Sequence, residues 1–295
     1  GDTKAYKTLS VKNNKPVYVK LNFDLIKTEN QFATYYDCLK SRYGQRYLVN
    51  ENTQVDFANM LSDFNDIGYL KVLDEAMFDM DSSNAYASNL TRQEHGIDHA
   101  ERVLTFASYI GLKSNLSARE MAILIESSKW HDCGRADVRT DSAHAIKSVD
   151  KINSLIGEGY SLEDINMMKA AIELHEINET KCNYDEVFNS ICNKYSIGEQ
   201  NAKSLKSISD ILKDADALDR TRFANGNLDP IRLRNTISAN LIKASCQLQE
   251  ARGFVDVESM KNQNMVSILK QKGWSDYDIS FNYKYFPEEI IKAIK

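Results

Sequence analysis

Proline is scarce in this chain, with only three among 295 residues, Pro16, Pro230 and Pro287. Because proline interrupts helices, its scarcity leaves long stretches that can stay helical. Most of these stretches carry apolar residues at i, i+3, i+4 and i+7, the spacing of one helix face. The sequence therefore predicts an all-α fold.

Cysteine is sparse, and its pattern excludes two kinds of site. The five cysteines are odd in number and scattered, and no two form a C-x-x-C pair. This spacing supports neither a disulfide framework nor a zinc site built from thiolates. It favours a reducing compartment, so we expect a cytoplasmic protein.

Long apolar runs and an excess of positive charge are also missing. No uncharged apolar run reaches 18 residues, and the opening GDTKAYKTLS lacks the apolar segment of a signal peptide. We therefore expect neither a membrane span nor an export signal. With 37 Lys and Arg against 42 Asp and Glu, the net charge is -5. Duplex nucleic acid is not an expected partner, whereas a small anionic substrate remains compatible.

The chain is long enough for one large core or two modest ones, and 42% of its residues are apolar. We divide it by character into three parts. Residues 1–90 are expected to form a helical N-terminal region, 91–245 a central core, and 246–295 a C-terminal helical extension. The central part holds all five histidines. We expect the three parts to pack as one compact unit.

The few histidines sit on the apolar faces of expected helices. In HGIDHAERVLTFASYIG, His99 shares a face with the apolar residues 4, 7 and 11 positions later. The next helix opens with the capping-box pattern S-A-R-E at 117–120 and runs into KWHD. There His131 lies two turns after Leu124, and Asp132 lies two turns after Ile125. All three polar residues thus extend faces that are expected to be buried.

Two further helices repeat this arrangement. One begins at S-L-E-D, where Ser161 is the expected cap, and its apolar face ends in His175. In the other, Asp216 lies one turn after Leu212, whereas Asp214 is rotated from Leu212 by about 200°. Helical phase therefore selects Asp216 over Asp214 as the inward carboxylate.

A single histidine on an apolar face is most often a hydrogen-bonded core residue. Here three helices each end an apolar face with histidine, and a fourth adds an inward aspartate. A buried carboxylate among several imidazoles is costly without a cation, so the set favours a metal site. Imidazole and carboxylate ligands suit Mn²⁺, Fe²⁺, Co²⁺ or Zn²⁺; Mg²⁺ is also compatible, and Ca²⁺ is not expected.

The order H…HD…D, made by His99, His131, Asp132 and Asp216, has HAERV and ADALDR around its ends. It resembles the HD superfamily of metal-dependent phosphohydrolases over about half of the chain, from position 95 to 234. The resemblance implies an HD-type helical core in which these four residues bind one metal. Members with two metals add two histidines between the HD pair and the last aspartate. Only His144 and His175 are placed to fill those positions.

The chemistry implied by such a site is hydrolysis of a phosphate ester or anhydride by a metal-activated water. Residues within helical reach of the ligands are candidates for the general acid or base. They are His95, Asp98, Glu176 and Asp219. Nearby cations are candidates for binding the phosphate, with solvated helix faces as the alternative. They are Arg135, Lys129, Arg220 and Arg222.

The sequence thus predicts a metal-dependent phosphohydrolase or phosphodiesterase, acting on a nucleotide or another small phosphorylated compound. Three alternatives stay open at this point. A diiron oxygenase would use the same His and Asp set with two irons and consume oxygen. A catalytically idle module would bind metal or nucleotide without turnover. A purely structural helical protein would bind no metal.

Overall fold

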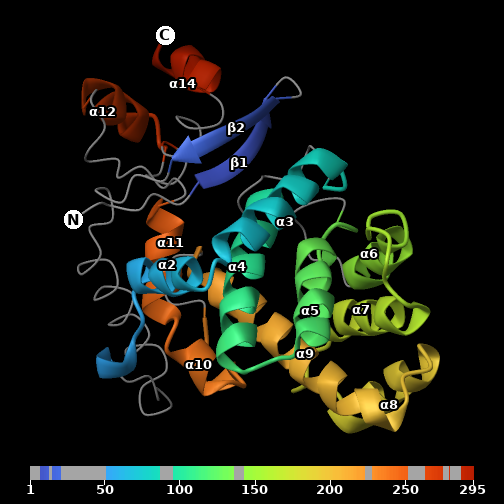
Figure 1. Cartoon of the computed structure of the whole chain (residues 1–295). Coiled ribbons are helices and arrows are strands. Elements are labelled where there is room, and N and C mark those ends of the chain that lie inside the picture. The colour runs from blue at the N-terminus through green and yellow to red at the C-terminus, as the bar shows by residue number, and fades with distance from the viewer. Residues whose placement is uncertain are drawn as a thin grey trace.

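The computed structural model describes residues 7–12, 15–20, 51–86, 96–135, 143–222, 228–251, 263–274, 279 and 287–295. Helices dominate this described part, which confirms the all-α class (Figure 1). The first α-helices are α2 (Phe57–Asp66), α3 (Leu70–Ser83), α4 (Ile97–Lys113), α5 (Ala118–Trp130), α6 (His144–Ile152) and α7 (Leu162–His175). They are followed by α8 (Tyr184–Lys194), α9 (Glu199–Leu218), α10 (Thr236–Ala239), α11 (Ile242–Ala251), α12 (Gln263–Gln271) and α14 (Pro287–Ile294). Three 3₁₀ turns complete the helical elements: η3 (Glu51–Thr53), η4 (Asp219–Arg222) and η5 (Pro230–Arg232).

The N-terminal region departs from the expected helices. Strands β1 (Lys7–Lys12) and β2 (Lys15–Lys20) pair antiparallel, with Lys7 opposite Lys20, and β1 lies beside α3 (Figure 1). The prediction of a helical region over 1–90 is therefore wrong for this segment. In KTLSVK polar and apolar residues alternate, and in KPVYVK, which follows two asparagines, the β-favouring residues Val17, Tyr18 and Val19 are consecutive. The period of two in KTLSVK is typical of a hairpin, and a helical interpretation overlooks it.

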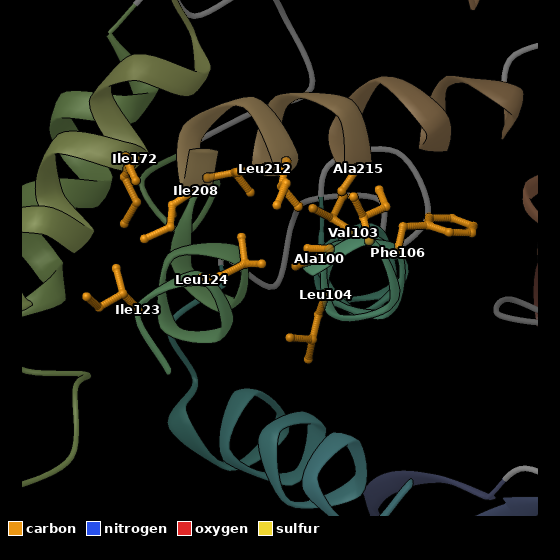
Figure 2. Close-up of a cluster of buried hydrophobic side chains, with 14 of the residues drawn as sticks. Ala100, Val103, Leu104, Phe106, Ile123, Leu124, Ile172, Ile208, Leu212 and Ala215 are labelled. Atoms are coloured by element: carbon orange, nitrogen blue, oxygen red, sulfur yellow. The ribbon is translucent and has the colours of Figure 1, made fainter. Parts of the chain in front are cut away.

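The core lies where α4, α5, α7 and α9 pack against one another (Figure 2). Buried side chains from α4, among them Val103 and Phe106, belong to the same cluster as Leu124 of α5 and Leu212 of α9. These are the apolar faces that the sequence predicted, and each one runs toward a histidine or aspartate at one end. The packing of four helices therefore fixes where those polar groups meet.

Helix starts in this body follow the expected caps. Ser117 accepts a hydrogen bond from the backbone of Glu120, and the Glu120 carboxylate accepts one in return from the Ser117 backbone. Ser161 and Asp164 form the same reciprocal box at the start of α7. Both boxes satisfy backbone N–H groups that a helix leaves unpaired. The starts of α5 and α7 are thereby fixed, and with them the position of each helix's last turn.

One apolar cluster extends from Phe57 to Leu248, so α2, α3 and α11 belong to the same core as the central helices. The Phe57 backbone donates to the buried Gln247 side chain at 2.5 Å, which ties α2 to α11. The predicted boundary at 245/246 falls inside α11. A second, smaller cluster joins α12, Ile279 and α14. Among the described residues, no helix has the length and apolarity needed to cross a bilayer.

We predict that Phe106→Ala lowers the free energy of unfolding by about 3–5 kcal/mol, because the Phe106 side chain of α4 is fully buried in the core. Urea denaturation followed by circular dichroism measures this loss. The control is Leu162→Ala on the exposed first turn of α7, expected to change stability by no more than about 0.5 kcal/mol. Equal losses in the two variants would contradict the assigned core.

Candidate metal centre

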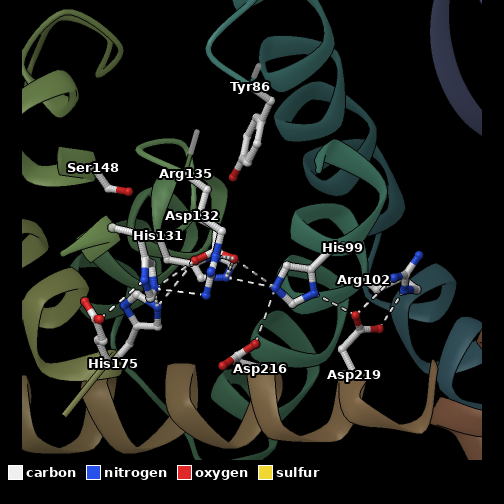
Figure 3. Close-up of polar contacts among 12 residues, drawn as sticks. Tyr86, His99, Arg102, His131, Asp132, Arg135, Ser148, His175, Asp216 and Asp219 are labelled. Carbon is white, nitrogen blue, oxygen red and sulfur yellow. Dashed lines mark hydrogen bonds and ion pairs between the residues drawn. The ribbon is translucent and has the colours of Figure 1, made fainter. Parts of the chain in front are cut away.

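His99 enters the site from the first turns of α4, on the same buried face as Val103. Its Nδ1 atom lies 2.6 Å from the Asp219 carboxylate, on the 3₁₀ turn that follows α9. Nδ1 therefore carries the proton and donates it, while Nε2 points the other way, into the cluster (Figure 3). The 120 positions that separate these two residues are bridged by the contact of α4 with α9 and η4.

Asp219 is itself held by two arginines. Arg102 donates to both of its oxygens at 2.6 and 3.0 Å, and Arg222 donates at 3.0 Å. Burial alone would raise the pKa of Asp219, but Arg102, Arg222 and His99 together hold it well below its usual range. The carboxylate is therefore ionised and acts on His99. For His99, burial and Arg222 act to lower the pKa, yet contacts with Asp216 and Asp219 outweigh them and raise it.

His131 and His175 are oriented in a different way, by their own helices. Each stands at the C-terminal end of a helix, α5 for His131 and α7 for His175. The Nδ1 atom of each donates to the carbonyl three residues earlier, at 2.9 Å to Ser128 and at 2.5 Å to Ile172. The last carbonyls of a helix lack intrahelical partners, so these bonds satisfy both groups. In both histidines Nε2 is left as the lone-pair atom.

Burial lowers the pKa of His131 to about 3. The ring is fully buried, and the nearby His175 and His99 also disfavour a charged form, although Asp132 acts in the opposite direction. His131 is therefore neutral at physiological pH. A neutral imidazole with its Nδ1 proton engaged is the form that binds a metal through Nε2.

Asp132 follows His131 directly and is almost fully buried. Its two oxygens face different histidines. Oδ2 lies 3.5 Å from His99 Nε2 and 3.9 Å from His131 Nε2, whereas Oδ1 lies 3.2 Å from His144 Nε2 and 3.6 Å from His175 Nε2. The Asp132 carboxylate thus connects two halves of the cluster. The first half contains His99 and His131, and the second half contains His144 and His175.

Asp216 completes the first half from α9, with Oδ1 3.3 Å from His99 Nε2. Its side chain is 37% exposed, whereas those of His99 and Asp132 are 1% and 3% exposed, so Asp216 marks the solvent edge of the cluster. Helical phase selected the carboxylate that faces the histidines, but the expectation that Asp216 is the more inward of the two was wrong, because Asp214 is fully buried. The Asp214 carboxylate is buried elsewhere, where it accepts hydrogen bonds from the backbone of Arg234 and Asn235.

The six residues whose convergence was predicted therefore meet in one place (Figure 3). Ligand atoms of His99, His131 and Asp216 lie within 4.8 Å of one another, as do those of His131, Asp132 and His175. The Nε2 atoms of His99 and His131 are only 3.2 Å apart. If neither Nε2 carries a proton, the two lone pairs face each other, and a bound cation would offset their repulsion.

The donor set fits a borderline divalent metal. It offers imidazole nitrogens and carboxylate oxygens, the ligands preferred by Mn²⁺, Fe²⁺, Co²⁺ and Zn²⁺. Cys133, the next residue after Asp132, is buried, and burial raises the pKa of its thiol to about 11. A protonated thiol is a poor metal ligand, so we expect the ligands to be the imidazole nitrogens and carboxylate oxygens and not Cys133.

The predicted acid and base candidates have separate outcomes. Asp219 is hydrogen-bonded to His99 Nδ1, so it orients a candidate metal ligand and does not itself face the centre of the cluster. Glu176 lies beside the second half, with Oε1 3.4 Å from His144 Nδ1 and Oε2 accepting from the Ala145 backbone. Asp98 is half-buried in the first turn of α4, and its role stays a prediction. His95 lies outside the described residues.

The predicted phosphate-binding cations also differ from one another. Arg135 reaches the cluster, with Nε 2.8 Å from Asp132 Oδ2. Arg222 is engaged with Asp219, and Arg220 is exposed just after α9. Lys129 is buried and pairs with Glu126 and Asp79 at 2.9 and 3.0 Å, an engagement that argues against its predicted substrate role.

Sequence reasoning missed the residues that attach α6 to the HD turn. The Gly134 backbone donates to Ser148 Oγ at 2.8 Å, and Lys151 Nζ donates to the Cys133 carbonyl at 2.7 Å. A side chain at Gly134 would have its Cβ 2.6 Å from the His144 carbonyl oxygen and closer still to the Ser148 nitrogen. The glycine in HDCG was the available signal, since close approach of two backbones requires one.

The chain matches no protein-family model, no curated protein and no solved structure. The function of the chain is therefore inferred from the geometry of the cluster. The HD superfamily remains a resemblance carried by the ordered H…HD…D residues.

We predict that Asp219→Asn weakens Mn²⁺ binding by roughly 10- to 100-fold, because residues that orient a metal-binding histidine have effects of that size. The asparagine amide has no negative charge. It therefore loses the ionic contact with His99 and leaves the charges of Arg102 and Arg222 without their anion. Competition with a chelator measures the affinity. Asp185→Asn, at an exposed carboxylate in the first turn of α8, is the matched control and should leave affinity unchanged.

We also predict that Gly134→Ala destabilises the protein by about 1–3 kcal/mol, since its methyl group collides with the backbone of α6. Gly111→Ala is the control. There the close atoms are Met121 Sδ and Leu124 Cδ2, the ends of flexible side chains, and alanine favours the helix. Thermal unfolding of both variants measures the difference. A Gly134→Ala protein at least as stable as Gly111→Ala would show that α6 is not attached closely at this turn.

Proposed function

We propose that this protein is a metal-dependent phosphohydrolase or phosphodiesterase that acts on a nucleotide or another small phosphorylated compound. The observation that carries the proposal is the convergence of His99, His131, Asp132 and Asp216, with imidazole protons engaged on the outer side. The ordered H…HD…D pattern and its resemblance to the HD superfamily support the same reaction class.

His99, His131, Asp132 and Asp216 would hold the ion. A divalent metal bound there would polarise a phosphoryl oxygen and lower the pKa of a coordinated water. The partial exposure of Asp216 favours substrate binding on that side, because the other three residues are buried.

Other side chains supply the remaining functions. Arg135, 13% exposed, offers a guanidinium whose planar donors suit a phosphate, and Arg220 offers an exposed charge near Asp216 in sequence. Glu176 is 21% exposed and borders the histidines, so it is the carboxylate best placed to accept or return a proton. Asp219 acts as a positioning residue through His99.

The test joins metal analysis of the full chain to a panel of phosphate monoesters, phosphodiesters and nucleotides. We expect Mn²⁺ or another divalent ion to support phosphate release. Asp216→Ala should lower kcat/KM by at least about 100-fold, the range seen when a main electrostatic contributor is lost. Asp185→Ala, an exposed carboxylate in the first turn of α8, should retain full activity.

The other outcomes of this test identify the alternatives. Two bound irons with oxygen consumption and no phosphate release would favour an oxygenase on the same residues. Metal binding without turnover on the whole panel would favour a binding module. A protein that folds and binds no divalent metal would overturn the proposal.

A further inference from the structure

Arg135 reaches the second half of the cluster, formed by His144, His175 and Asp132 Oδ1, and it also contacts Oδ2, the Asp132 oxygen that faces the first half. Its Nη2 atom lies 3.3 Å from His144 Nε2, and its Nε atom lies 2.8 Å from Asp132 Oδ2. The arginine side chain is largely buried. A permanent positive charge thus lies among the groups that the HD resemblance assigns to a second ion.

The tautomer of His144 follows from this contact. Because arginine has only donors, this contact assigns the acceptor role to His144 Nε2, although two acceptors, His175 Nε2 and Asp132 Oδ1, also lie 3.3 and 3.2 Å from it. The proton then resides on Nδ1, which faces the Glu176 carboxylate at 3.4 Å. His175 Nε2, the lone-pair atom of its ring, lies 3.3 Å from His144 Nε2. The guanidinium therefore supplies positive charge beside these two facing nitrogens.

An imidazole nitrogen has a single lone pair. His144 Nε2 can accept a hydrogen bond from Arg135 or bind a metal, and it cannot do both. A carboxylate oxygen is different, since it has more than one lone pair, and Asp132 Oδ2 can accept from Arg135 while it faces His99. Arginine and a second metal are therefore alternatives at His144, whereas the first half can hold its ion with Arg135 in place.

We propose that Arg135 serves as the cation of the second half and excludes a second metal from His144 and His175, so that the protein binds one tight divalent ion. The inference rests on the metal centre of the proposed function and is independent of which substrate is hydrolysed. Arg135 is one residue beyond Gly134 in the HD turn, and His144 is the first residue of α6. The close attachment of α6 at Gly134 and Ser148 keeps the two side chains within reach.

The experiment is a titration of the full chain with Mn²⁺, in which calorimetry and electron paramagnetic resonance measure the number of bound ions. Wild type should bind one tight equivalent. Arg135→Met keeps much of the side-chain length and removes the charge, and it should bind a second equivalent at least roughly 10-fold more tightly than wild type does. That factor corresponds to the loss of one charge-assisted hydrogen bond. In the variant with two ions, spin coupling should reduce the Mn²⁺ signal per ion.

Two controls locate the effect. Arg232→Met removes an exposed arginine from η5 and should leave the stoichiometry at one. Adding His144→Ala to Arg135→Met should return the stoichiometry from two to one. Two tight equivalents in wild type would overturn the inference, as would a folded Arg135→Met protein that stays at one. Arg135→Gln repeats the test if the methionine variant does not fold. Phosphate release can fail in all of these proteins without affecting this readout.

Discussion

Hydrogen bonds on the outer side of the histidine rings govern the whole site. His131 and His175 each donate Nδ1–H to a carbonyl in their own last helical turn, and His99 donates to Asp219. Each bond fixes the ring plane and leaves Nε2 as an acceptor that points inward. Because two of the acceptors are main-chain carbonyls at helix ends, the orientation of those rings depends on where α5 and α7 stop. The capping boxes at the opposite ends of these helices therefore contribute to the position of the site.

Charge is arranged in two layers around this centre. The inner layer has Asp132 and Asp216 with Arg135 beside them, and the outer layer has Asp219 between Arg102 and Arg222. Buried carboxylates are costly unless each has a partner, and here each carboxylate meets a histidine or an arginine. The outer layer neutralises the group that orients His99, so a cation in the inner layer interacts mainly with the two inner carboxylates. His99 can therefore face Asp219 through Nδ1 and the two inner carboxylates through Nε2.

Much of this arrangement could be predicted from the sequence, because helical phase alone relates residues within a helix. Phase placed His99, His131 and His175 on buried faces and chose Asp216 over Asp214. Helical phase does not predict how residues on two sides of a turn, or on two different helices, are placed relative to each other. The pairing of β1 with β2, the attachment of α6 at Gly134 and the contact of Arg135 with Asp132 all depend on contacts outside a single helix. Asp219 was named as a catalytic candidate, and its pairing with two arginines needed the fold.

The candidate ligands of the ion come from α4, the end of α5 and α9, which are far apart in the sequence. The unfolded chain brings none of these distant groups together, so a cation that binds the cluster has affinity for the native state alone. By mass action, free metal at 100 times its dissociation constant would add about 2.7 kcal/mol to the free energy of unfolding. Bringing such distant groups together also costs conformational entropy, which the binding free energy of a metal would offset. A metal that binds the cluster would therefore stabilise the native fold as well as complete the site.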